Sequence, residues 1–204
     1  MKVFAIFLLI AAMGLGIAPQ GRYEKKIEQH RREMDEKFRN PQTSPLRELA
    51  HTYTGQDYYP PDKTYRVRAR LERTPEAKPF RLPTSNPEVQ KQFVQYGILH
   101  FSLHGKACRL SVYRNLQLSN MPQYKDLLFL PFADQTSGLE TYGGGRYLDL
   151  EIPKGNKMVL DFNLCYNPYC AYSEGWSCPI IPRENYLPVP VRAGVKKYDK
   201  HAEK

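Results

Sequence analysis

The sequence predicts a mainly β protein, an antiparallel meander that forms a barrel or a sandwich, with one or two N-terminal helices. Three observations predict this class. Apolar and polar residues alternate with period two in several short segments after residue 58. Gly- or Pro-bearing turns separate these segments, and the helical pattern is confined to residues 22–52. At 204 residues the chain has room for one well-buried domain and an N-terminal appendage.

Residues 1–18 form an apolar leader. A lone Lys2 precedes an apolar run that ends at Ile17, and this run has the length of a signal-peptide core rather than of a membrane span. We therefore expect export, to the periplasm or as a secreted protein. The cleavage site is poor, because Ala18 is followed by Pro19. An uncleaved anchor stays an alternative, and it is the one membrane contact expected.

Residues 22–52 form the predicted helical segment. Its first part carries an apolar stripe at helical spacing, made of Tyr23, Ile27, Met34 and Phe38. Asn40-Pro41 ends this helix, and Ser44-Pro45 has the capping chemistry of a second, short helix that ends at about His51.

The β-rich domain is expected over residues 53–195, followed by a basic tail over residues 196–204. The expected strands are 64–72, 95–103, 109–113, 127–132, 146–152 and 157–163. Pro75 to Pro87 mark an irregular connection, because four prolines interrupt it.

The chain is basic, with 30 Lys and Arg against 21 Asp and Glu and a formal net charge of +9. The excess is spread over several segments instead of being massed in one. We interpret it as favouring solubility, and no nucleic-acid partner is expected, because no aromatic-basic motif is present.

Four cysteines in an exported chain permit disulfides in three full pairings, and the favoured bond joins Cys170 and Cys178. Such a bond would stabilise the fold by roughly 2–3 kcal/mol. No metal site is expected. The cysteines lack zinc-site spacing, and His100 and His104 on one strand would lie about 13 Å apart.

The glycine-rich run from Tyr142 to Arg146 resembles a phosphate cradle. A phosphate loop needs a helix after its glycines, whereas here a strand-like segment follows. Two interpretations stay open, a tight turn alone or a turn whose amides and Arg146 also contact a ligand.

Residues 146–163 predict a hairpin with its turn at Lys154-Gly155. In that register Arg146 would face Asn163, and Asp161 would lie on the same sheet face. Polar groups on an inner face require either mutual pairing or a ligand. We therefore expect an Arg146–Asp161 pair or a ligand site there.

The loop-rich segment 167–185 adds polar and aromatic side chains that either line a pocket or cover the sheet, among them Tyr169 and Trp176. The candidate ligand-binding residues are Glu140, Tyr142, Gly143, Gly144, Gly145, Arg146, Asp161, Asn163, Asn167, Tyr172, Glu184 and Asn185. Motifs of serine and metal hydrolases are missing, so no catalytic residue is assigned.

Three runs of this chain, LFLPFADQTSGLETYGGGRYLDL, LDFNLCYNPYCAYSEGWSCPIIPREN and YYPPDKTYRVRARL, resemble the bacterial and archaeal domain-of-unknown-function family 1684. The resemblance extends from the helix at Tyr23 to about Lys196 and implies a single exported or cytosolic domain, but no activity. Its shared motif residues include Asp134, Asp149, Tyr166, Tyr169, Cys170 and Cys178, besides most of the candidate residues. The chain departs from the pattern at Leu164-Cys165, so a disulfide through Cys165 is not expected.

The leading hypothesis for function is a small-ligand-binding or accessory domain with a polar pocket, and its partner would be a small molecule. One alternative is a hydrolase of extracytoplasmic glycan or cell-wall fragments that uses two carboxylates among Glu140, Asp161 and Glu184. Another is a structural or partner-docking domain. The sequence predicts neither a cofactor nor an oligomeric state.

Overall fold

The computed structural model describes residues 21–198. The predicted leader, residues 1–18, and the last residues of the basic tail lie outside this range. No helix within residues 21–198 is both long and apolar enough to cross a membrane.

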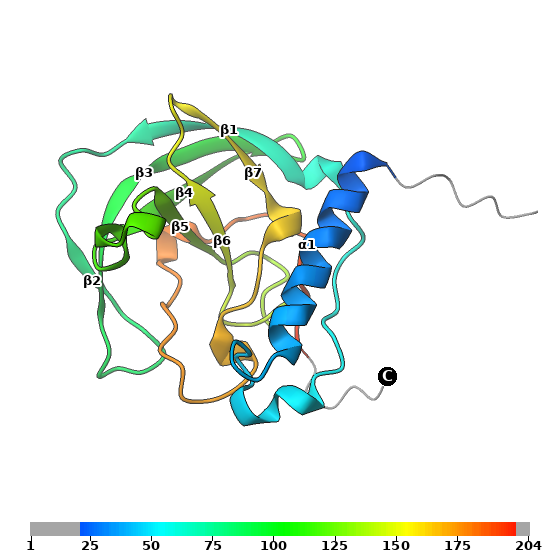
Figure 1. The fold of residues 1–204 in the computed structure, drawn as a ribbon. Coiled ribbons are helices and arrows are strands. Elements are labelled where there is room, and N and C mark those ends of the chain that lie inside the picture. The colour runs from blue at the N-terminus through cyan, green and yellow to red at the C-terminus, as the bar shows by residue number, and fades with distance from the viewer. Residues whose placement is uncertain (1–20, 199–204) are drawn as a thin grey trace, which may run out of the picture.

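The chain forms one antiparallel sheet that curls into a half-barrel (Figure 1). The strands are β1 (Arg66–Arg73), β2 (Phe80–Leu82), β3 (Lys91–Leu103), β4 (Lys106–Asn115), β5 (Leu127–Phe132), β6 (Arg146–Glu151) and β7 (Lys157–Asp161). Their order in the sheet is β6-β5-β4-β3-β1-β7, and β2 pairs with β3. The predicted mainly β class is confirmed, and each segment expected to be a strand overlaps one.

β2 was not predicted. It has three residues and lies in the proline-punctuated connection, where Phe80 pairs with Phe93. Strands this short lack enough residues to show alternation, and prolines at sheet edges mask them further.

The predicted N-terminal helix is α1 (Arg22–Arg39), which lies beside β7 in Figure 1. Ile27 and Phe38 of its apolar stripe are buried, and the Tyr23 hydroxyl donates to the Asp161 carboxylate at the end of β7, 2.9 Å away. The second expected helix is a 3-10 helix, Arg47–Thr52, and not an α-helix. Ser44 precedes it and accepts a hydrogen bond from the Leu46 amide.

Six further 3-10 helices are single turns, at Lys63–Tyr65, Leu118–Asn120, Pro122–Tyr124, Phe162–Leu164, Tyr169–Ala171 and Arg183–Asn185. Lys63–Tyr65 directly precedes β1, and Phe162–Leu164 directly follows β7.

Alternation along the strands separates two faces of the sheet. On β5 the side chains of Leu128, Leu130 and Phe132 are fully buried in the main core. The C-terminal stretch covers this inner face with Leu187, Val189, Val191 and Ala193. The opposite, outer face also carries large side chains, since Leu82, Phe93 and Tyr113 pack there against Phe129.

The predicted hairpin over residues 146–163 is wrong. β6 pairs with β5, where Arg146 lies opposite Phe132, and β7 pairs with β1, where Asp161 lies opposite Arg66. The two strands therefore occupy opposite edges of the sheet. The backbone bond from Ile152 to Asp126 continues the β5–β6 ladder, and the short connection after Ile152 crosses to the other edge instead of turning back. Arg146, Asp161 and Asn163 do not share a strand pair.

Candidate functional site

A cavity of about 600 Å³ lies against the outer face of β5 and β6, between α1 and the 164–179 segment. Aromatic rings from three strands, one 3-10 helix and the 164–179 segment line it: Phe93, Tyr124, Phe129, Tyr147, Tyr166, Tyr169 and Trp176. Met34 of α1 and Leu127 of β5 contribute aliphatic surface. Cavities of this size and composition are typical of small-molecule sites.

Four of these rings form a continuous row across the outer face, those of Phe93, Phe129, Tyr147 and Tyr166. The ring centroids of Phe93 and Phe129 lie 5.6 Å apart, those of Phe129 and Tyr147 4.7 Å, and those of Tyr147 and Tyr166 5.9 Å. The last two pairs are edge-to-face, and such arrangements hold neighbouring rings at fixed angles. The cavity wall is therefore built by side chains that support each other.

Asp149 places a carboxylate among these rings. It lies directly opposite Phe129 in the β5–β6 ladder, two residues after Tyr147, so it points to the same outer face. Its Oδ1 accepts a hydrogen bond of 2.9 Å from the Tyr166 hydroxyl. The surrounding protein displaces water and raises the pKa of Asp149, more than the Tyr166 hydrogen bond lowers it. The side chain is nonetheless open to the cavity.

Three basic side chains also line the cavity, those of His30, Lys37 and Lys91. Burial lowers the pKa of both His30 and Lys91. Lys37 of α1 places its ammonium over the Tyr169 ring, 5.5 Å from the centroid. Within residues 21–198 no Lys, Arg or His nitrogen lies within 4.0 Å of the Asp149 carboxylate. Lys37 nevertheless acts electrostatically on Asp149 and lowers the pKa of its carboxyl, so the carboxylate has a basic neighbour but no direct ion-pair partner among the described residues.

The expected disulfide is present, since Cys170 and Cys178 are bonded and Cys108 and Cys165 are free. The bond closes the short loop that carries Trp176 to the cavity. The Trp176 carbonyl accepts a hydrogen bond from the Ser85 hydroxyl at 2.8 Å, which fastens the loop to the segment after β2. Such a bond fits an oxidising compartment.

None of the candidate ligand-binding residues predicted from the sequence lines this cavity. Arg146 lies on the inner face and is completely buried. Its guanidinium donates to the Asp134 carboxylate at 2.8 Å and to the carbonyls of Val191 at 2.7 Å, Ala193 at 2.6 Å and Val195 at 3.2 Å. It thereby ties the C-terminal stretch to β6.

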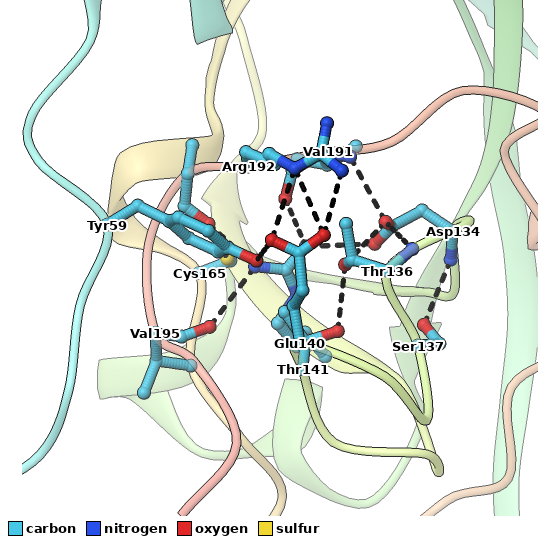
Figure 2. A network of polar contacts seen from close by, with 12 residues as sticks. Tyr59, Asp134, Thr136, Ser137, Glu140, Thr141, Cys165, Val191, Arg192 and Val195 are labelled. Carbon is cyan, nitrogen blue, oxygen red and sulfur yellow. Dashed lines mark hydrogen bonds and ion pairs between the residues drawn. The ribbon is translucent and has the colours of Figure 1, made fainter.

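Figure 2 shows the polar network around this contact, including Asp134, Thr136, Glu140 and Arg192. The second Asp134 oxygen accepts from the Thr136 amide at 2.8 Å and hydroxyl at 2.7 Å. Glu140 is exposed and forms a two-pronged ion pair with Arg192, which lowers the pKa of Glu140. The Tyr59 hydroxyl also donates to Glu140.

The glycine-rich run is a tight turn in which the Gly145 amide donates to the Tyr142 carbonyl at 3.0 Å. Gly145 has a φ of +79°, and a Cβ there would approach the Phe132 carbonyl to 2.6 Å. A side chain is therefore excluded at Gly145. Gly143 and Gly144 are exposed, and Tyr142 packs against the cluster around Phe38.

Asp161 and Asn163 hold the chain near α1 and β1. The Asn163 side chain accepts from the Asp62 amide at 2.9 Å and donates to the Asp62 carbonyl at 2.8 Å. Asp161 accepts from Tyr23 and from Asn163, and lies 3.6 Å from the Arg66 guanidinium.

Asn185 bridges two strands that pair at only one position, Tyr113 with Phe129. Its amide accepts from the Ser111 amide at 2.8 Å and donates to the carbonyls of Ser111 at 2.8 Å and Pro131 at 2.6 Å. One side chain thus replaces missing bonds between β4 and β5.

The remaining candidates also have partners within the chain. Glu184 accepts from the Tyr113 hydroxyl at 2.8 Å. Asn167 donates to the Lys196 carbonyl at 2.9 Å, and Tyr172 is buried with its hydroxyl on Gln56.

Sequence reasoning placed Tyr169 and Trp176 on a loop that lines a pocket or covers the sheet, and both line the cavity. It left out Tyr147, Phe129 and Asp149, because strand residues opposite a core face are ordinarily solvated. One signal was present, since Asp149 and Tyr166 are among the residues that carry the family resemblance. In the described part of the chain, no group of three or more His, Cys, Asp or Glu is arranged to hold a metal ion.

The fold and the cavity define a half-barrel β domain with an aromatic-walled cavity on the outer face of its sheet. The chain belongs to the family described as Protein of unknown function (DUF1684), whose profile matches residues 51–196. The family resemblance found in the sequence is thereby confirmed.

Among solved structures, the chain is similar to an uncharacterized protein of Haloarcula marismortui determined in solution by NMR. The two are 32% identical, the match covers 85% of this chain and 94% of the other, and the TM-score is 0.65. No match was found among curated proteins.

Proposed function

We propose that this protein binds a small organic ligand in the cavity between β5, β6 and α1. The observation that carries the proposal is a cavity of about 600 Å³ whose wall is a row of mutually packed aromatic rings. Aromatic walls bury apolar ligand surface, and a small number of polar groups orient the ligand. The polar residues predicted as the site would hold the scaffold around it.

The alternative of a two-carboxylate hydrolase finds less support. Such a mechanism needs two carboxylates facing one substrate. Asp149 is the one carboxylate among the lining residues that the structure describes. Glu140 is held by Arg192, and Asp161 and Glu184 lie outside the cavity.

We place the binding activity outside the cytoplasm as part of the same proposal. The Cys170–Cys178 disulfide supports an oxidising compartment, and the apolar leader of the sequence supports export. Fractionation of the native host tests this part, with the protein expected in the periplasm or the medium.

Trp176 offers a direct test of the site, because it is the only tryptophan of the chain and it lines the cavity. Titration of the intact protein with small aromatic compounds is expected to change Trp176 fluorescence saturably. Phe129→Ala removes the central ring and should weaken this binding at least about tenfold, equivalent to about 1.4 kcal/mol.

The matched control is Phe80→Ala, which deletes an aromatic ring on β2 that does not line the cavity. It should bind like the parent. Circular dichroism confirms that both variants are folded. Equal affinities of the parent and Phe129→Ala, or no saturable signal with any compound, would rule out this cavity as the site.

A further inference from the structure

The polar group inside the cavity indicates what kind of ligand the cavity takes. Asp149 is surrounded by Phe129, Tyr147 and Tyr166, and one of its oxygens already accepts the Tyr166 hydroxyl. The other oxygen has no hydrogen-bond or ion-pair partner within residues 21–198, and the side chain opens into the cavity. The charge of Lys37 acts on this carboxylate without forming an ion pair with it, so the exposed carboxylate can still pair directly with a cation.

The rings around Asp149, like its carboxylate, favour a positively charged ligand. Tyrosine and phenylalanine rings carry negative potential on their faces and attract cations. Tyr147 and Tyr166 are perpendicular, with an interplanar angle of 88°, so they form a corner and not a flat stack. A carboxylate beside an aromatic corner is the arrangement that recognises an organic ammonium group.

None of the basic side chains of the cavity forms an ion pair with Asp149. Lys91 begins β3, three strands away from Asp149 on β6, which corresponds to about 14 Å across the sheet. Lys37 lowers the pKa of Asp149 through space, but its ammonium lies over the Tyr169 ring and forms no ion pair with the carboxylate. His30 is on α1, where burial disfavours its charged form. The position next to Asp149 is left for a cation from outside the chain.

We propose that the ligand of this cavity is an organic cation, an amine or a quaternary ammonium compound, whose charge lies between Asp149 and the rings of Tyr147 and Tyr166. This inference rests on the proposed function of the cavity. It adds the ligand's charge and the residue that recognises it.

The test compares the affinities of three compounds for the unmodified protein, two of which have the same shape. Phenyltrimethylammonium carries a positive charge, tert-butylbenzene is its neutral isostere, and benzenesulfonate is an anion of similar size. Binding is followed by Trp176 fluorescence and by calorimetry. The cation should bind at least about tenfold more tightly than the isostere, because it gains both the ion pair and the ring contacts.

Two variants test whether Asp149 causes the preference for the cation over its neutral isostere. Asp149→Asn removes the charge with little change of shape and should abolish the difference between cation and isostere. Glu151→Gln is the matched control, since it makes the same change two residues further along β6, outside the cavity lining. In the parent the affinity for the cation should fall as pH is lowered and Asp149 becomes protonated, while Asp149→Asn should show no such fall.

The outcomes separate the two proposals. If the cation and the isostere bind the parent equally, or if benzenesulfonate binds best, the cation proposal is overturned and the cavity stands as a binding site. If Asp149→Asn keeps the full preference for the cation, Asp149 is not the recognising group and the proposal is also overturned. If none of the three compounds binds, both proposals lose their support.

Discussion

Arg146 is a fully buried cation with one buried partner, Asp134. Its guanidinium also satisfies three carbonyls of the C-terminal stretch. Arg146→Met would leave the Asp134 carboxylate buried without its counter-charge, and we expect it to lower the free energy of unfolding by about 3–5 kcal/mol. Urea unfolding followed by circular dichroism measures this change.

Arg192→Met provides the matched control for that experiment. Arg192 also pairs with a carboxylate, Glu140, but both side chains are exposed, at 55% and 39%. Water screens such a pair, so its removal should leave stability nearly unchanged. Equal losses in the two variants would show that burial of Arg146 is not what makes its pair important.

The charge of Asp149 destabilises the fold, whereas the charge of Arg146 stabilises it. Its desolvating surroundings raise its pKa above the ordinary value of 3.8, so the folded state holds this proton more tightly than the unfolded chain does. The side chain is exposed to the cavity, so solvent screening keeps the effect on stability small. As pH rises through the range between the two pKa values, ionised Asp149 therefore destabilises the fold. Asp149→Asn should be more stable than the parent at pH 7, and the difference should vanish below about pH 4.

Chemical unfolding of both proteins at several pH values measures this difference. A variant less stable than the parent at pH 7 would contradict it. A gain in stability on losing a polar group is typical of positions kept for binding.

At the scale of elements, local patterns predicted the strands but not their partners. The segments of β1 and β3 alternate, because burial of one face acts on each strand separately. The turn at Lys154-Gly155 indicated a hairpin. The pairing instead follows the curvature of the sheet, which carries the connection from one edge to the other. That information is not local in the sequence.

The β4–β5 pair illustrates a second limit of sequence patterns. Two strands joined at a single register position would leave backbone groups unpaired, and Asn185 supplies those bonds from a distant loop. Asn185 was singled out in the sequence as a polar residue that contacts ligand. Its type and position were informative, but its partner, the backbone of Ser111, is 74 residues away.

At the scale of the whole molecule, the two sides of the half-barrel differ in what covers them. Its inner face is filled by aliphatic side chains and sealed by the C-terminal stretch. Its outer face carries aromatic residues that α1 and the disulfide loop cover incompletely, which leaves the cavity. The sequence singled out polar residues such as Arg146 as candidate ligand contacts, whereas Arg146 holds the inner side together. It also named two rings of the outer side, Tyr169 and Trp176. The rest of the site depends on how the sheet curves.

The Cys170–Cys178 disulfide connects the structure with the proposed oxidising compartment. Of four cysteines, Cys108 and Cys165 are free and buried, whereas Cys170 and Cys178 are bonded. Protein isolated without reductant and then denatured should therefore expose two titratable thiols, and four after reduction. Reduction should also lower the free energy of unfolding by about 2–3 kcal/mol, because the closed loop restricts the unfolded chain. The variant Cys170→Ser with Cys178→Ser should match the reduced protein and should not respond to dithiothreitol. Four thiols before reduction would argue against both the bond and an oxidising compartment.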